Sequence, residues 1–353
     1  MSLINFSQIH PRAFAHPADK MATSAFTQIP MLPELLKKVS QLGIEKRFRA
    51  HHMYNSVQLG SNQFPSIWRM VNEVAERLCI PVPKAYVSRQ GNANAFAFGN
   101  SVHSIVLSTE LIELMTEREL QGIIAHEMGH ILCEHLLYMD VGIALTSGAL
   151  PTFARTIPGL EESVNSLFFA WFRAAEYSAD RAALLILEDP EPLAACLSRL
   201  AGVPRRLEKE FDLRVFVEQV EDYREEATLW SKIVTFGMGM FLTHPEPAKR
   251  VGSILDWAKS ADYQAILKGR YLTRFEVEAF DQVRIEGVRS CPSCGRSVGE
   301  APVCADCGLV QNPRQQQICP LNPRHINGID WQFCVACGAK LNPDAGRREI
   351  PGD

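Results

Sequence analysis

The sequence has 353 residues, of which 46% are hydrophobic and 22% are charged, and its formal net charge is −4. This length suffices for one sizeable core and a small additional module. The slightly negative charge gives no electrostatic reason to expect binding to nucleic acid or to an anionic membrane. Met1 to Pro11 lack the basic and apolar regions of a secretory signal. The apolar windows 136–154 and 233–242 are too interrupted or too short to predict an integral membrane span.

Ten cysteines are present, and seven of them follow position 290 in mostly paired spacing. This is the usage of metal ligands, and it differs from the disulfide framework of a secreted domain. We therefore expect a protein of the reducing cytoplasm. Cys79, Cys133 and Cys196 lack metal-like spacing and are interpreted as buried thiols.

Residues 1–30 are interpreted as a lead-in that packs on the main domain. Apolar residues at helical spacing predict helices within 31–48 and 67–78, and β-branched or alternating runs predict strands at 84–88, 92–99 and 104–108. We expect these strands to form a small antiparallel sheet. The run Asn92 to Gly99 is either an exposed edge, to which a peptide could add as an extra strand, or an interior hairpin with no such role.

Thr116 and Glu119 fit a capping box that begins a helix, and this helix contains His126-Glu127-Met128-Gly129-His130. Two histidines four residues apart project from the same face of a helix, so both imidazoles can reach one metal ion. Glu127, beside the first histidine, can take a proton from an attacking water. The pattern predicts the zinc site of a metallopeptidase.

A catalytic zinc ion needs a third protein ligand. Position 136 is leucine, which excludes one histidine-based pattern, and no glutamate occurs between His135 and Glu161. Glu176 is the preferred ligand, because a carboxylate among aromatic and alanine neighbours is costly unless it is paired or bound to metal. Asp180 lies one turn later and could orient a ligand histidine, although a surface or salt-bridged pair is the alternative. Glu161 and Glu162 are rivals at the start of the same predicted helix.

His135 follows His130 by five residues, about 140° around a continuing helix, so we expect it to point away from the ion. His135 and Glu134 are both interpreted as structural or surface residues. Further helices are predicted from about 163 to 187, 193 to 200, 207 to 230 and 246 to 259. The main domain is placed at 31–260, and a connector of poorly defined structure at 261–289.

Four of these elements together resemble the M48 family of zinc peptidases, relatives of HtpX and of the CAAX prenyl endopeptidase. They are listed in chain order: Asn94-Ala95-Phe96-Ala97, His126 to His130, Glu176 to Asp180, and His244-Pro245 with Arg250. The resemblance implies a zincin-like fold in which Glu176 is the third ligand, Asp180 stands behind a ligand histidine, and the Asn94 strand binds substrate. It also implies that His244 and Arg250 lie near the active site, His244 as an oxyanion donor, a reversible zinc ligand or a structural turn.

The C-terminal segment 290–342 resembles a double zinc ribbon, and a short tail, 343–353, follows it. Its first half supplies four thiolates: Cys291, Cys294, Cys304 and Cys307. Its second half supplies Cys319, Cys334 and Cys337, with His325 chosen as fourth ligand; a fold without metal is the alternative. Six basic and six acidic residues from Cys291 onward give no footprint for nucleic acid, so a protein partner is favoured.

The sequence therefore predicts a mainly helical α+β zinc endopeptidase that acts on polypeptides, with Glu127 as general base. It would hold one catalytic zinc and one or two structural zinc ions. The competing hypothesis is a non-catalytic or chaperone-like scaffold that keeps the zinc site for recognition.

Overall fold

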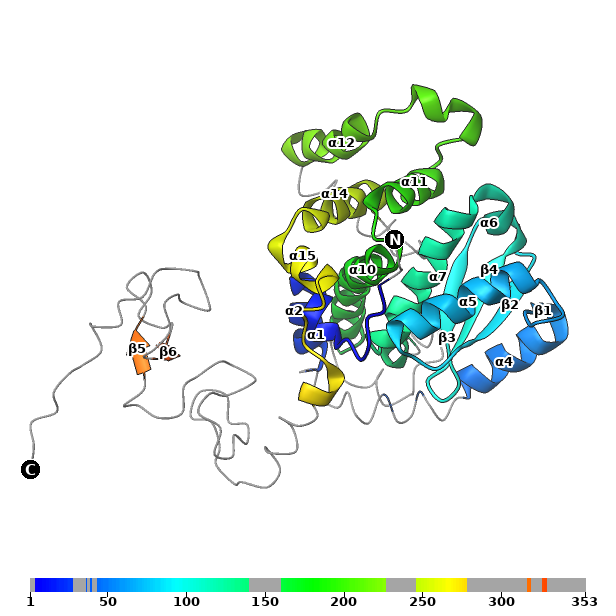
Figure 1. Ribbon diagram of the computed structural model, residues 1–353, viewed down its shortest axis with the longest axis horizontal. Helices are drawn as coiled ribbons and strands as arrows, with labels where there is room; N and C mark the ends of the chain where they lie inside the picture. The colour runs from blue at the N-terminus through cyan, green and yellow to red at the C-terminus, as the bar shows by residue number, and fades with distance from the viewer. Residues whose placement is uncertain are drawn as a thin grey trace, which may run out of the picture. The chain divides into compact units, whose positions relative to one another are not determined.

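The structure is a computed structural model, and it describes residues 4–27, 36, 39, 43–139, 160–226, 246–277, 316–318 and 326–328. The chain divides into two compact units, Met1–Leu272 and Thr273–Asp353. In the first unit the described elements are mainly helices around one four-stranded sheet (Figure 1). This agrees with the predicted mainly helical α+β class.

The sheet is formed by β1 (Val57–Gln58), β2 (Lys84–Ser88), β3 (Ala95–Phe98) and β4 (Ser104–Ser108), in the order β1-β2-β4-β3. β3 and β4 form an antiparallel pair, but β2 runs parallel to β4. The prediction of an antiparallel sheet is therefore wrong, and the sheet is mixed. The reason is topological: the chain leaves β2 and passes to the far side of β4 before it forms β3, so that β4 separates the two earlier strands.

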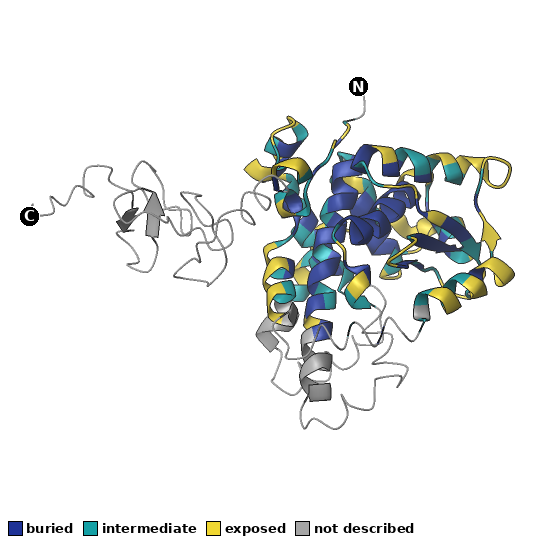
Figure 2. Cartoon of the chain, turned by 90° about the horizontal axis from the view of Figure 1, so that it is seen from below, coloured by how far each residue is buried: buried dark blue, intermediate teal, exposed yellow. Residues whose placement is uncertain are grey.

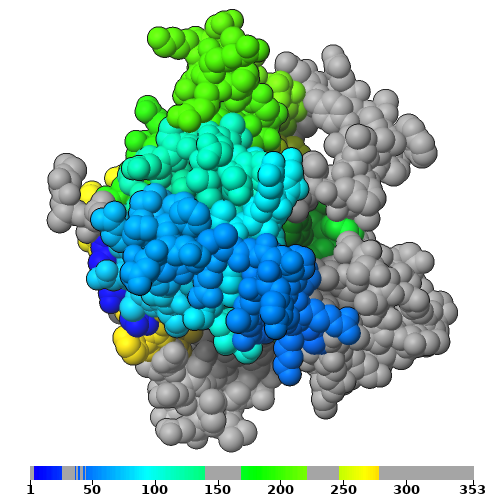
Figure 3. All heavy atoms as spheres, turned by 90° about the vertical axis from the view of Figure 1, so that its right-hand side faces the viewer, coloured from blue at the N-terminus to red at the C-terminus, as the bar shows by residue number. Residues whose placement is uncertain are grey.

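Side-chain alternation gives the sheet two buried faces. One face carries Ala85, Ile105 and Leu107, which join a core shared with α5 (Pro65–Leu78). The opposite face carries an aromatic cluster of Tyr86, Phe96 and Phe98, with Phe48 of α4 (Ile44–Asn55) packed against it. α4, α5 and the segment directly after α5, coloured blue to cyan, lie side by side on one face of the molecule (Figure 3).

After β4 the first unit continues as helices. They are α6 (Thr109–Leu114), α7 (Glu117–Leu132), α10 (Leu160–Leu187), α11 (Pro190–Leu200), the 3-10 helix η1 (Arg205–Glu210), α12 (Leu213–Glu226), α14 (Pro247–Ala258) and α15 (Ala261–Leu267). Buried residues gather where the inner helices meet, whereas exposed residues line the outer ones (Figure 2). Within the described segments, no helix combines the length and the apolar character needed to cross a bilayer.

The N-terminal segment, with α1 (Pro11–Phe14) and α2 (Pro17–Thr27), is built into this core. Phe6, Ile9 and Phe14 are buried in it. Backbone bonds tie the segment to distant elements, since Phe6 N donates to Arg77 O at 2.8 Å and His10 N donates to Leu272 O at 2.9 Å. Residues ahead of the sheet therefore have a fixed place beside α10.

α7 packs along α10, and small residues allow the two helix backbones to approach closely. A Cβ atom added at Gly129 would lie 2.8 Å from the Cβ atom of Ala182 and 3.0 Å from the Cα atom of Ala179. Real Cβ contacts are not this short, so only glycine fits between the helices at this position. The close approach brings the side chains at the facing positions of α7 and α10 within reach of one metal ion.

In the second unit the structure describes a two-stranded antiparallel sheet of β5 (Gln316–Ile318) and β6 (Ile326–Gly328). The predicted ribbon ligands and the tail at 343–353 lie outside the described residues.

Candidate metal centre

The predicted capping box is present at the start of α7. Glu119 N donates to Thr116 Oγ1 at 3.3 Å, and Thr116 N donates to Glu119 Oε2 at 2.7 Å. Glu119 is also held by Arg199 of α11, whose Nε donates to Glu119 Oε1 at 2.9 Å. The cap satisfies backbone groups of the first turn and fixes where α7 begins.

His126 and His130 of α7 and Glu176 of α10 converge as a buried group of potential metal ligands, with their donor atoms all within 4.8 Å of one another. The two Nε2 atoms are 3.2 Å apart. Glu176 Oε2 is 3.5 Å from His126 Nε2, and its Oε1 is 3.2 Å from His130 Nε2. A tetrahedral zinc site with bonds of about 2.0–2.1 Å places its ligand atoms about 3.3 Å apart. The donor set therefore fits a zinc ion.

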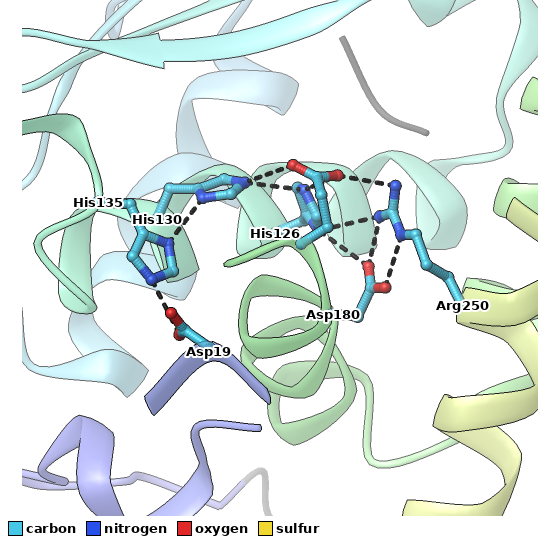
Figure 4. A network of polar contacts seen from close by, with 7 residues as sticks. Asp19, His126, His130, His135, Asp180 and Arg250 are labelled. Atoms are coloured by element: carbon cyan, nitrogen blue, oxygen red, sulfur yellow. Dashed lines mark hydrogen bonds and ion pairs between the residues drawn. The ribbon is translucent and has the colours of Figure 1, made fainter. Parts of the chain in front are cut away.

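Behind His126 lies a buried ion pair. His126 Nδ1 is 3.0 Å from Asp180 Oδ1, and Arg250 donates to both Asp180 oxygens, at 2.6 and 2.7 Å. Arg250 Nη1 also lies 2.8 Å from Glu176 Oε2. Asp180 thus fixes the imidazole orientation, and Arg250 places one positive charge between the two carboxylates (Figure 4).

Behind His130 lies His135, which is not in the group of potential metal ligands. It is buried, which is the structural alternative of the prediction, and its Nδ1 lies 2.9 Å from His130 Nδ1, a contact that the spacing did not predict. Its Nε2 lies 3.1 Å from Asp19 Oδ2 of α2. The extrapolation along a continuing helix fails because α7 ends at Leu132 and Glu134 adopts a left-handed backbone with φ of 59°. Neither Asp19 nor the link from His135 was found from the sequence, and the only signal was a histidine soon after the pattern.

Glu127 borders a cavity of about 250 Å³. β3 and the residues before it contribute Asn94 and Ala95 to the wall, and α7 contributes His126. Apolar side chains form much of the remainder: Leu111, Ile123, Leu193, Leu197 and Leu200. The predicted substrate strand and the predicted general base therefore face one apolar space.

Burial and charge act differently on the two histidines. Burial disfavours the imidazolium at both positions, but Glu176 and Asp180 outweigh it and raise the pKa of His126 to about 9. At His130 burial dominates and lowers the pKa to about 3. Burial also opposes ionisation of Asp180 and Asp19, yet Arg250 and His135 respectively help hold the pKa of each carboxyl below its usual value. A metal ion would replace the proton on His126, so metal binding is expected to release a proton.

The structure places β3 at a sheet edge, where it pairs with β4 and with no other described strand. Glu161 and Glu162 lie at the start of α10, fifteen and fourteen residues before Glu176. His244 and Pro245 lie outside the described residues. Among the other cysteines, Cys196 is buried and Cys79 and Cys133 are partly buried.

Comparison with known proteins decides the family. The model of peptidase family M48 matches residues 61–258. The chain belongs to peptidase family M48. It is 32% identical over 268 residues to the plastoglobule-localized metallopeptidase 48 of Arabidopsis thaliana, a match that covers 74% of this chain and 77% of that protein.

Among bacterial relatives, this M48 peptidase is 27% identical to a protease HtpX homolog of Ralstonia nicotianae, over 60% of this chain and 81% of the relative. The crystal structure of S. mikatae Ste24p matches at 17% identity with a TM-score of 0.36, covering 67% of this chain and 62% of that one. The family supports zinc-dependent proteolysis in general, and the buried histidine–glutamate group is the part of this chain that fits the metal.

Proposed function

We propose that this M48 peptidase is a zinc-dependent endopeptidase in which His126, His130 and Glu176 hold the metal and Glu127 is the general base. The observation that carries the proposal is the convergence of three buried donor atoms beside a cavity that Glu127 also borders. Three electron-pair donors at tetrahedral spacing are the arrangement that a zinc ion requires.

A bound zinc ion supplies Lewis acidity, which makes a water molecule acidic near neutral pH and polarises a peptide carbonyl. Glu127 accepts the proton of the attacking water and delivers it to the nitrogen of the leaving amine. Asp180 keeps the imidazole of His126 in one orientation, with Nε2 directed into the site. Arg250 also borders the cavity, and we assign it the role of a positioning residue whose positive charge pairs with Asp180 and Glu176. His244 remains a candidate for an oxyanion donor or a regulatory ligand.

The substrate is proposed to lie along β3 in an extended conformation. Asn94 and Ala95 line the cavity, and the backbone of β3 occupies the sheet edge with Phe96 and Ala97. A peptide added there would form main-chain hydrogen bonds that do not depend on its sequence. Selectivity would come from the cavity, whose leucine-rich wall favours an apolar substrate side chain beside the scissile bond.

The C-terminal segment is proposed to be the double zinc ribbon, binding structural zinc and a protein partner in the cytoplasm. One feature of the sheet supports the choice of ligands in its second half. Ile318 and Ile326 are register partners across β5 and β6. Cys319 directly follows the first and His325 directly precedes the second in the sequence. The paired strands β5 and β6 therefore flank, in sequence, the segment that contains both predicted ligands.

Glu127→Gln tests the proposed function. Gln keeps the shape of the side chain but cannot accept the proton, so cleavage of an unfolded model protein should fall by about 10²- to 10⁴-fold. Zinc content, measured by atomic emission, should stay at the wild-type value. Glu117→Gln is the matched control, because this glutamate is exposed in the first turn of the same helix. Unchanged cleavage by Glu127→Gln, or chelator-resistant cleavage by the wild type, would refute the proposal.

A further inference from the structure

His130, His135 and Asp19 form a hydrogen-bonded chain that leads away from the metal centre (Figure 4). His130 Nδ1 and His135 Nδ1 are 2.9 Å apart, and His135 Nε2 and Asp19 Oδ2 are 3.1 Å apart. All three side chains are buried. They come from two separate parts of the chain: α7 with the turn directly after it, and α2.

Only one arrangement of protons satisfies both contacts when His130 faces the metal through Nε2. A neutral imidazole that coordinates through Nε2 carries its proton on Nδ1 and donates it. His135 must then accept at Nδ1 and carry its own proton on Nε2. That proton points at the Asp19 carboxylate, which can only accept. Asp19 therefore sets the tautomer of His135, and His135 sets that of His130.

Asp19 is itself held in place by neighbours that donate to it. Ser178 Oγ donates to Asp19 Oδ2 at 2.6 Å, and Thr23 Oγ1 donates to Asp19 Oδ1 at 3.1 Å. Trp171 Nε1 donates to Thr23 Oγ1 at 3.0 Å, and the indole packs edge-to-face on the His135 ring. A carboxylate with this many donors has a fixed orientation, which is what a reference point for two imidazoles requires.

The turn after α7 aims His135 at its target. Glu134 N donates to Ile131 O at 3.1 Å, and His135 N donates to His130 O at 3.0 Å. With Glu134 in the left-handed region, this pair of bonds is a Schellman motif. The motif turns the chain back on the helix end, so that the His135 ring lies against His130 within the protein interior.

We propose that Asp19 and His135 are positioning residues for the zinc ligand His130. The inference rests on the proposed zinc site. It makes the N-terminal segment, which precedes the family-matched residues 61–258, a working part of the metal centre. Partners of this kind behind a metal ligand typically change metal affinity by about 10- to 100-fold.

The test measures Zn²⁺ dissociation constants of full-length variants by competition with a chromophoric chelator, with no substrate present. The cysteines of the proposed ribbon would bind Zn²⁺ as well, so the Zn²⁺ binding that is lost in His126→Ala is assigned to the α7–α10 site. His135→Leu removes the acceptor, and Asp19→Ala removes the carboxylate; each should weaken Zn²⁺ binding at the α7–α10 site about 10- to 100-fold. His135→Asn keeps an acceptor at the position of Nδ1 and should recover most of the affinity.

Glu119→Gln is the control, because Glu119 is an equally buried carboxylate in hydrogen bonds on the same helix but faces Arg199. It should lower thermal stability and leave the Zn²⁺ dissociation constant unchanged. The Co²⁺-substituted protein gives a second readout: its visible absorption bands should shift in His135→Leu and not in Glu119→Gln. If His135→Leu fails to fold, Asp19→Ala and His135→Asn carry the same test.

The outcomes separate the two proposals. A wild-type protein that binds no Zn²⁺ at the α7–α10 site would overturn both the proposed function and the positioning role of Asp19 and His135. If the wild type binds Zn²⁺ there, and folded His135→Leu and Asp19→Ala keep its affinity and Co²⁺ spectrum, the positioning role alone would be overturned. Weakened binding that His135→Asn restores would support it.

Discussion

The two histidines of the metal centre are held by different means. His126 contacts the Asp180 carboxylate directly, and Arg250 pairs with that carboxylate. His130 contacts a second imidazole, His135, and the carboxylate stands one residue further away. The first arrangement lies within the segment that matches the family, whereas the second depends on Asp19, which lies before it.

The two histidines therefore differ in the kind of interaction that supports them: ion pairs behind His126 and hydrogen bonds of a neutral ring behind His130. At His126, two buried carboxylates share one guanidinium, so the support is an ion network whose parts cannot be removed singly without leaving a buried charge. At His130, the support is a neutral ring between donor and acceptor, anchored by a carboxylate with hydroxyl donors. Substitutions on the first side should therefore cost stability, and those on the second should act mainly on metal affinity.

The largest effect is expected from Arg250→Leu, which breaks the support of His126. Asp180 and Glu176 would stay buried without their cation, so the metal-free protein should lose about 3–5 kcal/mol of unfolding free energy near neutral pH. Denaturant unfolding measures this. Arg214→Leu is the control, because Arg214 pairs with Asp212 at the surface with 85% of its side chain exposed; its effect should be below about 1 kcal/mol.

The stability loss of Arg250→Leu should depend on pH. In the wild type the pKa of Asp180 lies below its usual value, because Arg250 and neighbouring hydrogen bonds outweigh burial. Its stabilising contribution is thus present above the unfolded pKa and is lost as pH falls through the folded pKa. Without Arg250, burial raises the pKa of Asp180. Protonation of Asp180 should therefore reduce the variant's loss of unfolding free energy as the pH falls from 7 towards 4. A deficit that does not narrow over this range would contradict the ion-network description.

A smaller effect is expected from Gly129→Ala, which acts on both histidines at once. The new Cβ atom would meet Ala179 O at 3.1 Å and Ala182 Cβ at 2.8 Å, so α7 and α10 must move apart. Overpacking of this kind costs about 1–3 kcal/mol, and separation of the helices should also weaken Zn²⁺ binding. In Gly252→Ala of α14 the Cβ atom would meet only the Val217 Cγ1 atom, at 3.3 Å. This control should be neutral or slightly stabilising, because alanine favours helix.

Local signals predicted the parts of the site that depend on one helix or strand. The capping box fixed the start of α7, the spacing of four placed His126 and His130 on one face, and the strand at β2 was predicted at its observed bounds. Elimination and chemistry led to Glu176 as third ligand, and the convergence of its carboxylate with the two histidines fits that choice. Short-range periodicity suffices for these elements because each follows from its own residues.

Features that depend on long-range packing were not predictable in this way. The parallel pairing of β2 with β4 depends on which side of β4 receives β3, and both arrangements have the same strand pattern. Asp19 is 116 residues from His135, and no local pattern connects an aspartate in an N-terminal helix to a histidine after α7. The contact of His135 with His130 was not predicted for a local reason, because a non-glycine residue, Glu134, adopts the left-handed conformation of the Schellman motif.

The smallest effect is expected at that turn, and it sharpens the description of the His130 side. Glu134 has φ of 59°, a conformation that costs most residues free energy but suits glycine. Glu134→Gly should therefore stabilise the protein by about 0.5 kcal/mol, after the entropy of glycine in the unfolded chain is subtracted. It should leave Zn²⁺ affinity unchanged, because the bonds to Ile131 O and His130 O are made by backbone atoms. Glu134→Val should lower the stability of the protein and weaken Zn²⁺ binding, since a β-branched residue resists this conformation and would displace His135. If thermal melting and chelator competition showed the valine variant to be less stable but equal in Zn²⁺ affinity, the turn would serve the fold alone and would not aim His135 at His130.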